Sequence, residues 1–111
     1  MSSQIPHKYS GNVGGTVINL ASKGAQNLRF VQALNSAQIG YIQIFNLPST
    51  SVTLGTTVPA LSFGVPVSAA IVIPIPEEGI LLAGDGMSVA CTTTRGGLTA
   101  ALMDVNIGWG N

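Results

Sequence analysis

The side chains that could act as acids, bases, nucleophiles or metal ligands are few in this sequence and lie far apart. It contains one histidine, His7, and one cysteine, Cys91, which are too few for a zinc site and leave a cysteine nucleophile without a base close to it in the sequence. Glu77 and Glu78 are adjacent in a turn signal, where a solvated pair is expected rather than an acid and a base around a substrate. Asp85 in Gly-Asp-Gly is a turn former, and one carboxylate does not make a calcium site. We therefore predict that the protein is not an enzyme and binds no metal or other cofactor.

Cys91 and the glycine-rich segment near the N-terminus have simpler explanations than chemistry. In Ser-Val-Ala-Cys-Thr, Cys91 shares a strand face with Val89, which is typical of a small buried hydrophobic residue. A single cysteine allows no disulfide within the chain. Residues 11–15, Gly-Asn-Val-Gly-Gly, do not resemble a phosphate loop, because no lysine follows them, no strand is predicted before them and no helix after them.

The shortage of charge is the most informative feature of the composition. Charged residues make up 7% of the 111 residues, against about 25% in typical globular domains. The four Lys and Arg residues balance the four Asp and Glu residues and are spread along the chain, whereas a nucleic-acid binder gathers basic residues on one face. Since soluble monomers normally keep charge on their surface, we expect other subunits to cover much of this protein, or hydroxyl and amide groups to keep its surface hydrated.

Membrane association is not expected either. The longest apolar stretch, residues 69–75, contains Pro74 and is too short to span a bilayer. The N-terminus lacks the apolar run of a signal peptide and has Ser2 where myristoylation requires glycine. We expect synthesis in a cytoplasm.

The hydrophobic pattern predicts an all-β fold. From residue 16 onward, short apolar runs alternate with turn signals every eight to twelve residues or so, which is the rhythm of a sandwich or barrel. No window has the apolar spacing of a helix. The predicted strands are residues 16–20, 27–35, 39–45, 60–63, 68–74, 80–82, 87–93 and 101–107. We predict a two-sheet antiparallel sandwich, jelly-roll-like, over residues 16–111, with residues 1–15 as an extended N-terminal arm.

Three of these strands carry specific expectations. Period-two alternation places Leu28, Phe30 and Leu34 on one face of the second strand. Pro59 and Pro66 frame the strand at 60–63, which predicts an edge strand or a bulged crossing because proline cannot donate a ladder hydrogen bond. In the last strand, the residues expected to point inward are Met103, Val105 and Ile107.

Several apolar residues are candidates for contact with another subunit. Residues 69–73, Ala-Ala-Ile-Val-Ile, are apolar on both faces, so one face is either exposed or covered by a loop of the same chain or by a neighbouring subunit. Trp109 in the Gly-Trp-Gly tail could anchor an interface or close the domain's own sandwich. The candidates for a subunit or capsid interface are Ile5, Tyr9, Tyr41, Ile71, Val72, Ile73 and Trp109.

From residue 28 on, the sequence resembles a group of small virion proteins of tailed bacteriophages. The resemblance rests on Leu-Arg-Phe-Val at 28–31, Tyr-Ile-Gln-Ile-Phe-Asn at 41–46, an apolar strand ending in Ile-Pro at 73–74, and Gly-Met-Ser-Val-Ala-Cys-Thr at 86–92. It is most specific in Leu-Gly-Thr-Thr-Val-Pro at 54–59. The continuous Ala-Ala-Ile-Val-Ile and the Gly-Trp-Gly tail depart from the usual pattern.

The resemblance implies a capsid cement, or decoration, protein. Such proteins sit as homotrimers on the outer surface of a phage head and bridge subunits of the major capsid protein. With few charges to screen, we expect such attachment to depend little on salt. A head-fibre or tail module that binds a host glycan, and a cellular binding domain unrelated to phage, are the alternatives. The low aromatic content, 5%, argues against a rich glycan site.

Overall fold

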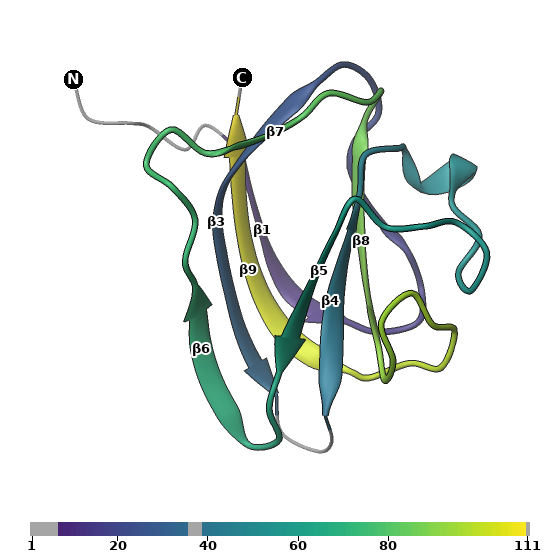
Figure 1. The fold of residues 1–111 in the computed structure, drawn as a ribbon, viewed down its shortest axis with the longest axis vertical. Helices are drawn as coiled ribbons and strands as arrows, with labels where there is room; N and C mark the ends of the chain where they lie inside the picture. Colours follow the sequence, from purple (N-terminus) through teal and green to yellow (C-terminus); the bar gives the residue numbers. More distant parts are fainter. Residues whose placement is uncertain (1–6, 36–38, 111) are drawn as a thin grey trace.

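Two antiparallel β-sheets pack face to face in the computed structural model, which describes residues 7–35 and 39–110. Strands β1, β9, β3 and β6 follow one another in the five-stranded sheet, with β7 also paired to β3, and β2, β8, β4 and β5 form the four-stranded sheet (Figure 1). This confirms the predicted two-sheet sandwich. The elements are β1 (His7–Val13), β2 (Ile18–Ala21), β3 (Gln26–Asn35), β4 (Gly40–Phe45), the 3-10 helix η1 (Ser49–Ser51), β5 (Leu61–Val65), β6 (Ala69–Ile73), β7 (Ile80–Leu82), β8 (Met87–Thr92) and β9 (Met103–Gly110).

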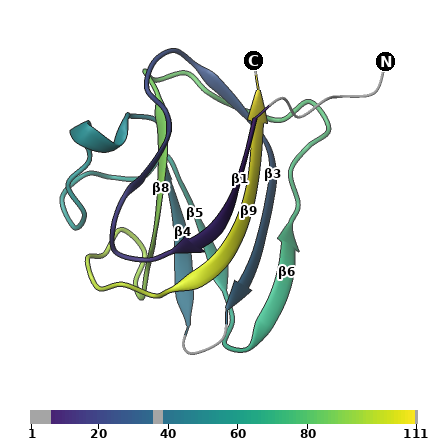
Figure 2. The ribbon, with the colours of Figure 1, turned by 180° about the vertical axis from the view of Figure 1, so that it is seen from behind.

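The N-terminal segment is a strand of the sandwich from His7 onward. β1 pairs with β9 over its whole length, from His7 opposite Trp109 to Val13 opposite Met103 (Figure 2). Val13 is 1% exposed and belongs to the core. The prediction of an arm outside the core is therefore wrong for β1, while residues 1–6 lie outside the described part of the chain. The strand escapes recognition because a glycine interrupts its inward face and its outward face is polar.

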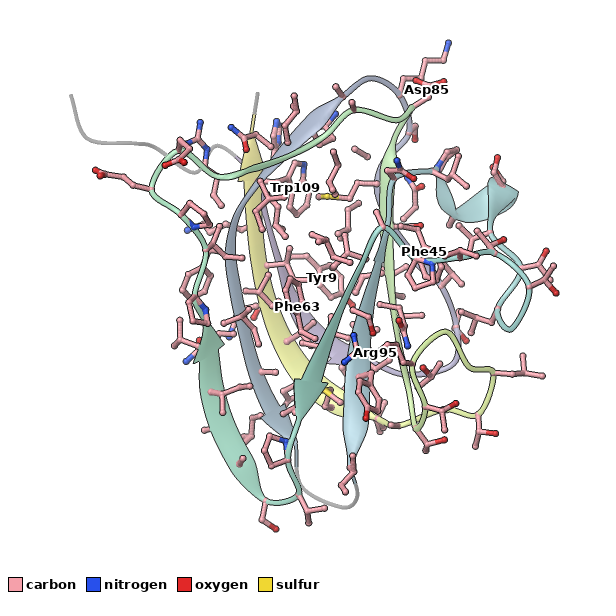
Figure 3. The ribbon with its side chains drawn as sticks, viewed as in Figure 1. Tyr9, Phe45, Phe63, Asp85, Arg95 and Trp109 are labelled. Atoms are coloured by element: carbon pink, nitrogen blue, oxygen red, sulfur yellow. The ribbon has the colours of Figure 1, made fainter. Side chains whose placement is uncertain are left out.

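The core lies between the sheets and contains the inward side chains of both. Tyr9 from β1 and Phe63 from β5 pack against it from opposite layers (Figure 3). Cys91 on β8 is fully buried in it, as predicted for a small hydrophobic residue. The prediction for the last strand is also confirmed, since the residues buried on β9 include Met103, Val105 and Ile107.

A bulge in β3 reverses the face on which its apolar side chains lie. Leu28, Val31 and Ala33 are buried, whereas Leu34 is 51% exposed. The register between β3 and β9 shifts between Leu28 and Phe30, and one extra residue moves every later side chain to the opposite face. The expectation that Leu28, Phe30 and Leu34 share a face is therefore wrong.

The prolines mark a sheet edge as predicted. β5 is the last strand of the four-stranded sheet and has β4 as its neighbour. Pro59 precedes it and Pro66 follows it, outside the hydrogen-bonded ladder. Within the described ranges, no helix is long and apolar enough to cross a membrane.

Candidate functional site

The side chains that could take part in chemistry are packed or hydrogen-bonded within the fold. The His7 ring stacks on Trp109, with ring centroids 5.7 Å apart. Burial raises the pKa of the Cys91 thiol to about 12, which keeps it in its unreactive protonated form at neutral pH. The backbone N–H of Gly24 donates to Asp85 Oδ1 over 2.7 Å, so this carboxylate ties two turns together. Among residues 7–35 and 39–110, no three His, Cys, Asp or Glu side chains are grouped to hold a metal ion.

Four of the predicted interface residues contribute to the domain's own core. Ile73 and Trp109 are buried, at 8% and 6% exposure, and Tyr9 and Ile71 are half-buried against the same core. They lie on the inward faces of β1, β6 and β9. The prediction that Ile73 and Trp109 are presented to a partner is therefore wrong, and of the two alternatives for Trp109 the structure shows the one that closes the domain's own sandwich.

The other three predicted interface residues differ in their exposure and in whether the structure describes them. Val72 is 57% exposed and points away from the core on β6. Tyr41 is half-buried beneath a guanidinium group of the same chain. Ile5 lies outside the described residues. Only Val72 among the described candidates is freely available for contact.

The outward face of the four-stranded sheet is covered by loops of the same chain. Gln43 and Phe45 on β4 point outward, yet they are 0% and 1% exposed. The Gln43 Nε2 group donates to Thr92 Oγ1 (2.8 Å) and to the Thr94 carbonyl (3.1 Å). Ser88 Oγ donates to the Leu47 carbonyl. Residues 46–60 and 93–102 therefore act as a second cover on this sheet (Figure 1).

The outward face of the five-stranded sheet, here called the open face, carries small polar groups and apolar side chains. Ser10 Oγ donates to Asn106 Oδ1, and Asn106 Nδ2 donates to Gln32 Oε1 over 3.2 Å, so a polar ladder crosses β1, β9 and β3. Val72 continues the same row on β6, opposite Gln32. Two hollows of about 410 and 480 Å³ share this ladder as a wall. The apolar residues exposed on this face are Leu34, Val72 and Leu81.

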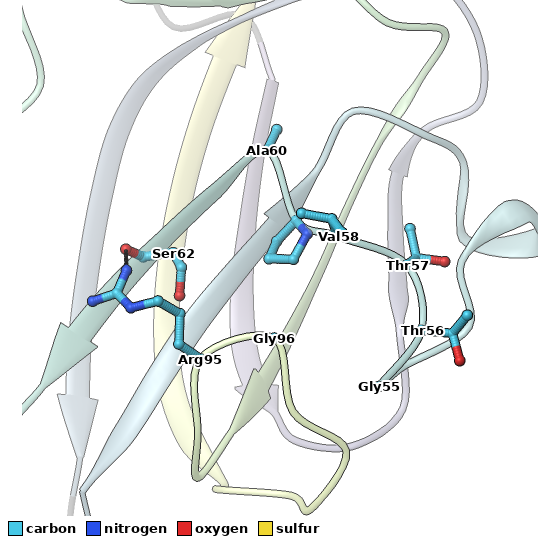
Figure 4. A pocket seen from close by; sticks show the side chains of 9 residues that line it. Gly55, Thr56, Thr57, Val58, Ala60, Ser62, Arg95 and Gly96 are labelled. Carbon is cyan, nitrogen blue, oxygen red and sulfur yellow. Dashed lines mark hydrogen bonds between the residues drawn. The ribbon is translucent and has the colours of Figure 1, made fainter.

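A separate pocket lies beside the edge strand β5. It has a volume of about 420 Å³ and is called the Arg95 pocket (Figure 4). The Arg95 guanidinium carbon lies 5.0 Å from the centre of the Tyr41 ring, and its Nη1 donates to the Ser62 carbonyl over 2.9 Å. The lining residues are Gly55, Thr56, Thr57, Val58, Pro59, Ala60, Ser62, Arg95 and Gly96.

In the sequence, Arg95 begins Arg-Gly-Gly, which is typical of a turn. Its one local signal is a basic side chain in a segment without acidic neighbours. The partners that orient it, Tyr41 and Ser62, belong to β4 and β5, so the pocket exists only once the four-stranded sheet has formed.

Comparisons with protein-family models, with curated proteins and with solved structures found no match for this chain.

Proposed function

We propose that the protein is a structural virion protein, a capsid cement or decoration protein. It would pack on the outside of a phage head as a homotrimer and stabilise the head by bridging subunits of the major capsid protein. The sequence resemblance supplies the family in this proposal. The open face is the single structural observation that supports it best.

The open face has the composition that favours burial against another protein. Its outward charged side chains on β1 and β9 are Lys8 and Asp104, near opposite ends of the face. Arg29 lies at the bulge of β3, where its Nη1 donates to the Glu77 carbonyl. Interface cores are depleted in charge because desolvating an ion is costly. Leu34 and Val72 are about half exposed, and covering such side chains contributes on the order of 1 kcal/mol each. Covering the open face with a partner therefore costs little free energy of desolvation and buries several apolar side chains.

We also infer jelly-roll connectivity from the way the strands pair. The antiparallel pairs β1–β9, β2–β8, β3–β6 and β4–β5 are nested in the sequence. A long hairpin rolled into a sandwich has this nesting, and β7 is an addition at β3. Jelly rolls are used in viral capsid and lectin domains, which agrees with both the cement proposal and its alternative, although a fold does not fix a function.

The first test is the copy number of the protein in purified particles of the phage that encodes it. Quantitative mass spectrometry against the major capsid protein should give a number approaching that of the capsid protein. A handful of copies per particle would instead favour a head-fibre or tail module. Absence from the particle would overturn the virion assignment.

The second test asks whether the open face makes the attachment. Val72→Asp places a charge in the apolar part of this face and should abolish binding to capsids that lack the protein. Thr50→Asp makes the same change at an exposed position in η1 and should bind as the unmodified protein does. Wild-type binding should change little between low and high salt, and a steep loss with salt would contradict apolar attachment.

A further inference from the structure

We propose that the Arg95 pocket binds a carboxylate-bearing sugar, such as a uronic acid. This inference goes beyond capsid attachment and does not depend on it. It rests on three features of the pocket: an oriented guanidinium, the lack of any acidic group that would neutralise it, and a lining of hydroxyl and small apolar groups.

The guanidinium of Arg95 is held in place before any ligand arrives. The N–H of Gly97 donates to the Thr94 carbonyl over 2.9 Å and closes the turn that carries Arg95. Tyr41 supports one face of the guanidinium, and the Ser62 carbonyl accepts from Nη1 (Figure 4). A guanidinium has five N–H donors, and within the described part of the chain Ser62 is the only residue that accepts a hydrogen bond from Arg95. The remaining donors are sufficient for a two-point contact with a carboxylate.

No acidic residue lines this pocket. Glu77 and Glu78 lie in the turn before β7, Asp85 is engaged by Gly24, and Asp104 lies on β9 in the open face. The positive charge therefore has no compensating carboxylate in the pocket. A single arginine, without a lysine or a second arginine among the lining residues, matches a singly charged carboxylate better than a phosphate with higher charge.

The rest of the lining suits a sugar ring. Thr57 Oγ1 accepts from the N–H of Thr53 over 2.9 Å, which fixes this oxygen and leaves its O–H free to donate to a ligand. Val58, 83% exposed at the rim, and Pro59 offer apolar contact for the C–H face of a ring. A ligand with a carboxylate, hydroxyl groups and an apolar face would use all of these features.

The test is an NMR titration of the purified, full-length protein with sodium glucuronate. Glucose and sodium acetate serve as parallel ligands that carry only the sugar or only the carboxylate. We expect saturable shifts of the Arg95 Nε–H signal and of the amides of residues 55–60, with a dissociation constant roughly in the millimolar range. Glucuronate should bind at least about tenfold more tightly than either acetate or glucose.

Three outcomes would overturn the proposal. Shifts that do not saturate, or that lie outside residues 55–60 and 95–96, would show that the pocket is not a site. Glucose binding as tightly as glucuronate would show that Arg95 does not recognise the carboxylate. Acetate binding as tightly as glucuronate would show that the ligand is not a sugar.

Variants link the binding to Arg95 itself. Arg95→Gln should weaken glucuronate binding about tenfold or more, and Arg95→Lys should also weaken it because the planar fork is lost while the charge remains. Lys23→Gln makes the same charge change at an exposed turn that does not line the pocket, and it should bind normally. Unchanged spectra outside the pocket would verify that each variant is folded. Since no capsid is used, the result is independent of whether the protein occurs in virions.

Discussion

The outward faces of the two sheets differ in what covers them, although both are built from short antiparallel strands. On the four-stranded sheet, loops of the same chain bury Phe45 and Gln43 almost completely. On the five-stranded sheet, the outward residues Leu34 and Val72 are 51% and 57% exposed. The outward side chains of the four-stranded sheet are therefore covered by loops, whereas those of the five-stranded sheet are exposed to solvent.

This difference shows which outward apolar side chains are buried within the domain and which remain exposed. The outward residues Gln43 and Phe45 of β4 are covered by loops within the domain. The doubly apolar strand β6 has no such cover among the described residues, since Val72 is exposed. Of the two covers considered for residues 69–73, a loop or a neighbouring subunit, no loop among the described residues covers Val72, and a subunit is proposed.

The largest expected effect comes from removing β1, an edge strand of the five-stranded sheet. Deletion of residues 1–13 removes β1, including the buried Val13 and the half-buried Tyr9. Burying Val13 alone is worth about 1.5–3 kcal/mol, and the ladder with β9 is lost as well, out of a total stability of about 5–15 kcal/mol. We expect the free energy of unfolding to fall by several kcal/mol or cooperative unfolding to disappear, as measured by urea denaturation.

A control for this deletion lies on the same strand. Lys8→Ser with Asn12→Ser changes only exposed side chains of β1 and should leave the midpoint nearly unchanged. If the deletion were as stable as this control, β1 would not belong to the folded core, and the segment would be an arm after all.

Two phenylalanines compare the outward faces directly. Phe45→Ala removes a ring that the loops bury and should cost about 3–5 kcal/mol of unfolding free energy. Phe30 lines a hollow of the open face and is only partly buried, so Phe30→Ala should cost about 1 kcal/mol. Equal losses in urea denaturation would mean that residues 46–60 and 93–102 do not cover the four-stranded sheet in solution.

Two glutamines make the same comparison for polar groups. Gln43 is fully buried and donates to Thr92 and Thr94, so Gln43→Ala should cost about 1–3 kcal/mol. Gln32 accepts from Asn106 on the open face, and Gln32→Ala should change stability by no more than about 0.5 kcal/mol. Thermal unfolding of both variants would measure the difference, and the reverse order would contradict the assignment of the covered face.

Cys91 reports on the core that both sheets share. Burial raises its pKa from 9.0 to about 12, so above pH 9 the unfolded chain releases a proton that the folded protein keeps. Stability is therefore full below pH 9 and falls between pH 9 and 12. Between pH 8 and pH 10 we expect a loss of about 1.4 kcal/mol that the Cys91→Ala variant does not show. Urea denaturation at both pH values would test this. An equal loss of unfolding free energy between pH 8 and pH 10 in the wild-type protein and in Cys91→Ala would mean that Cys91 ionises without unfolding.

The class of fold follows from local patterns in the sequence. Alternating apolar residues and turn residues are local signals, and the segment predicted at 80–82 is the strand β7, while the prolines correctly placed β5 at a sheet edge. The inward face of β9 was equally predictable, because no bulge interrupts its alternation between Met103 and Ile107.

Which sheet faces are covered, and where a pocket forms, depends on contacts between segments that are distant in the sequence. The bulge that turns Leu34 outward is defined by the register with β9, about eighty positions later in the chain. Gln43 is buried because Thr92, 49 positions away, lies beside it, and Arg95 acquires its orientation from β4 and β5. Burial depends on the segments that fill the space around a residue, and a local pattern cannot encode segments that are brought close only by folding.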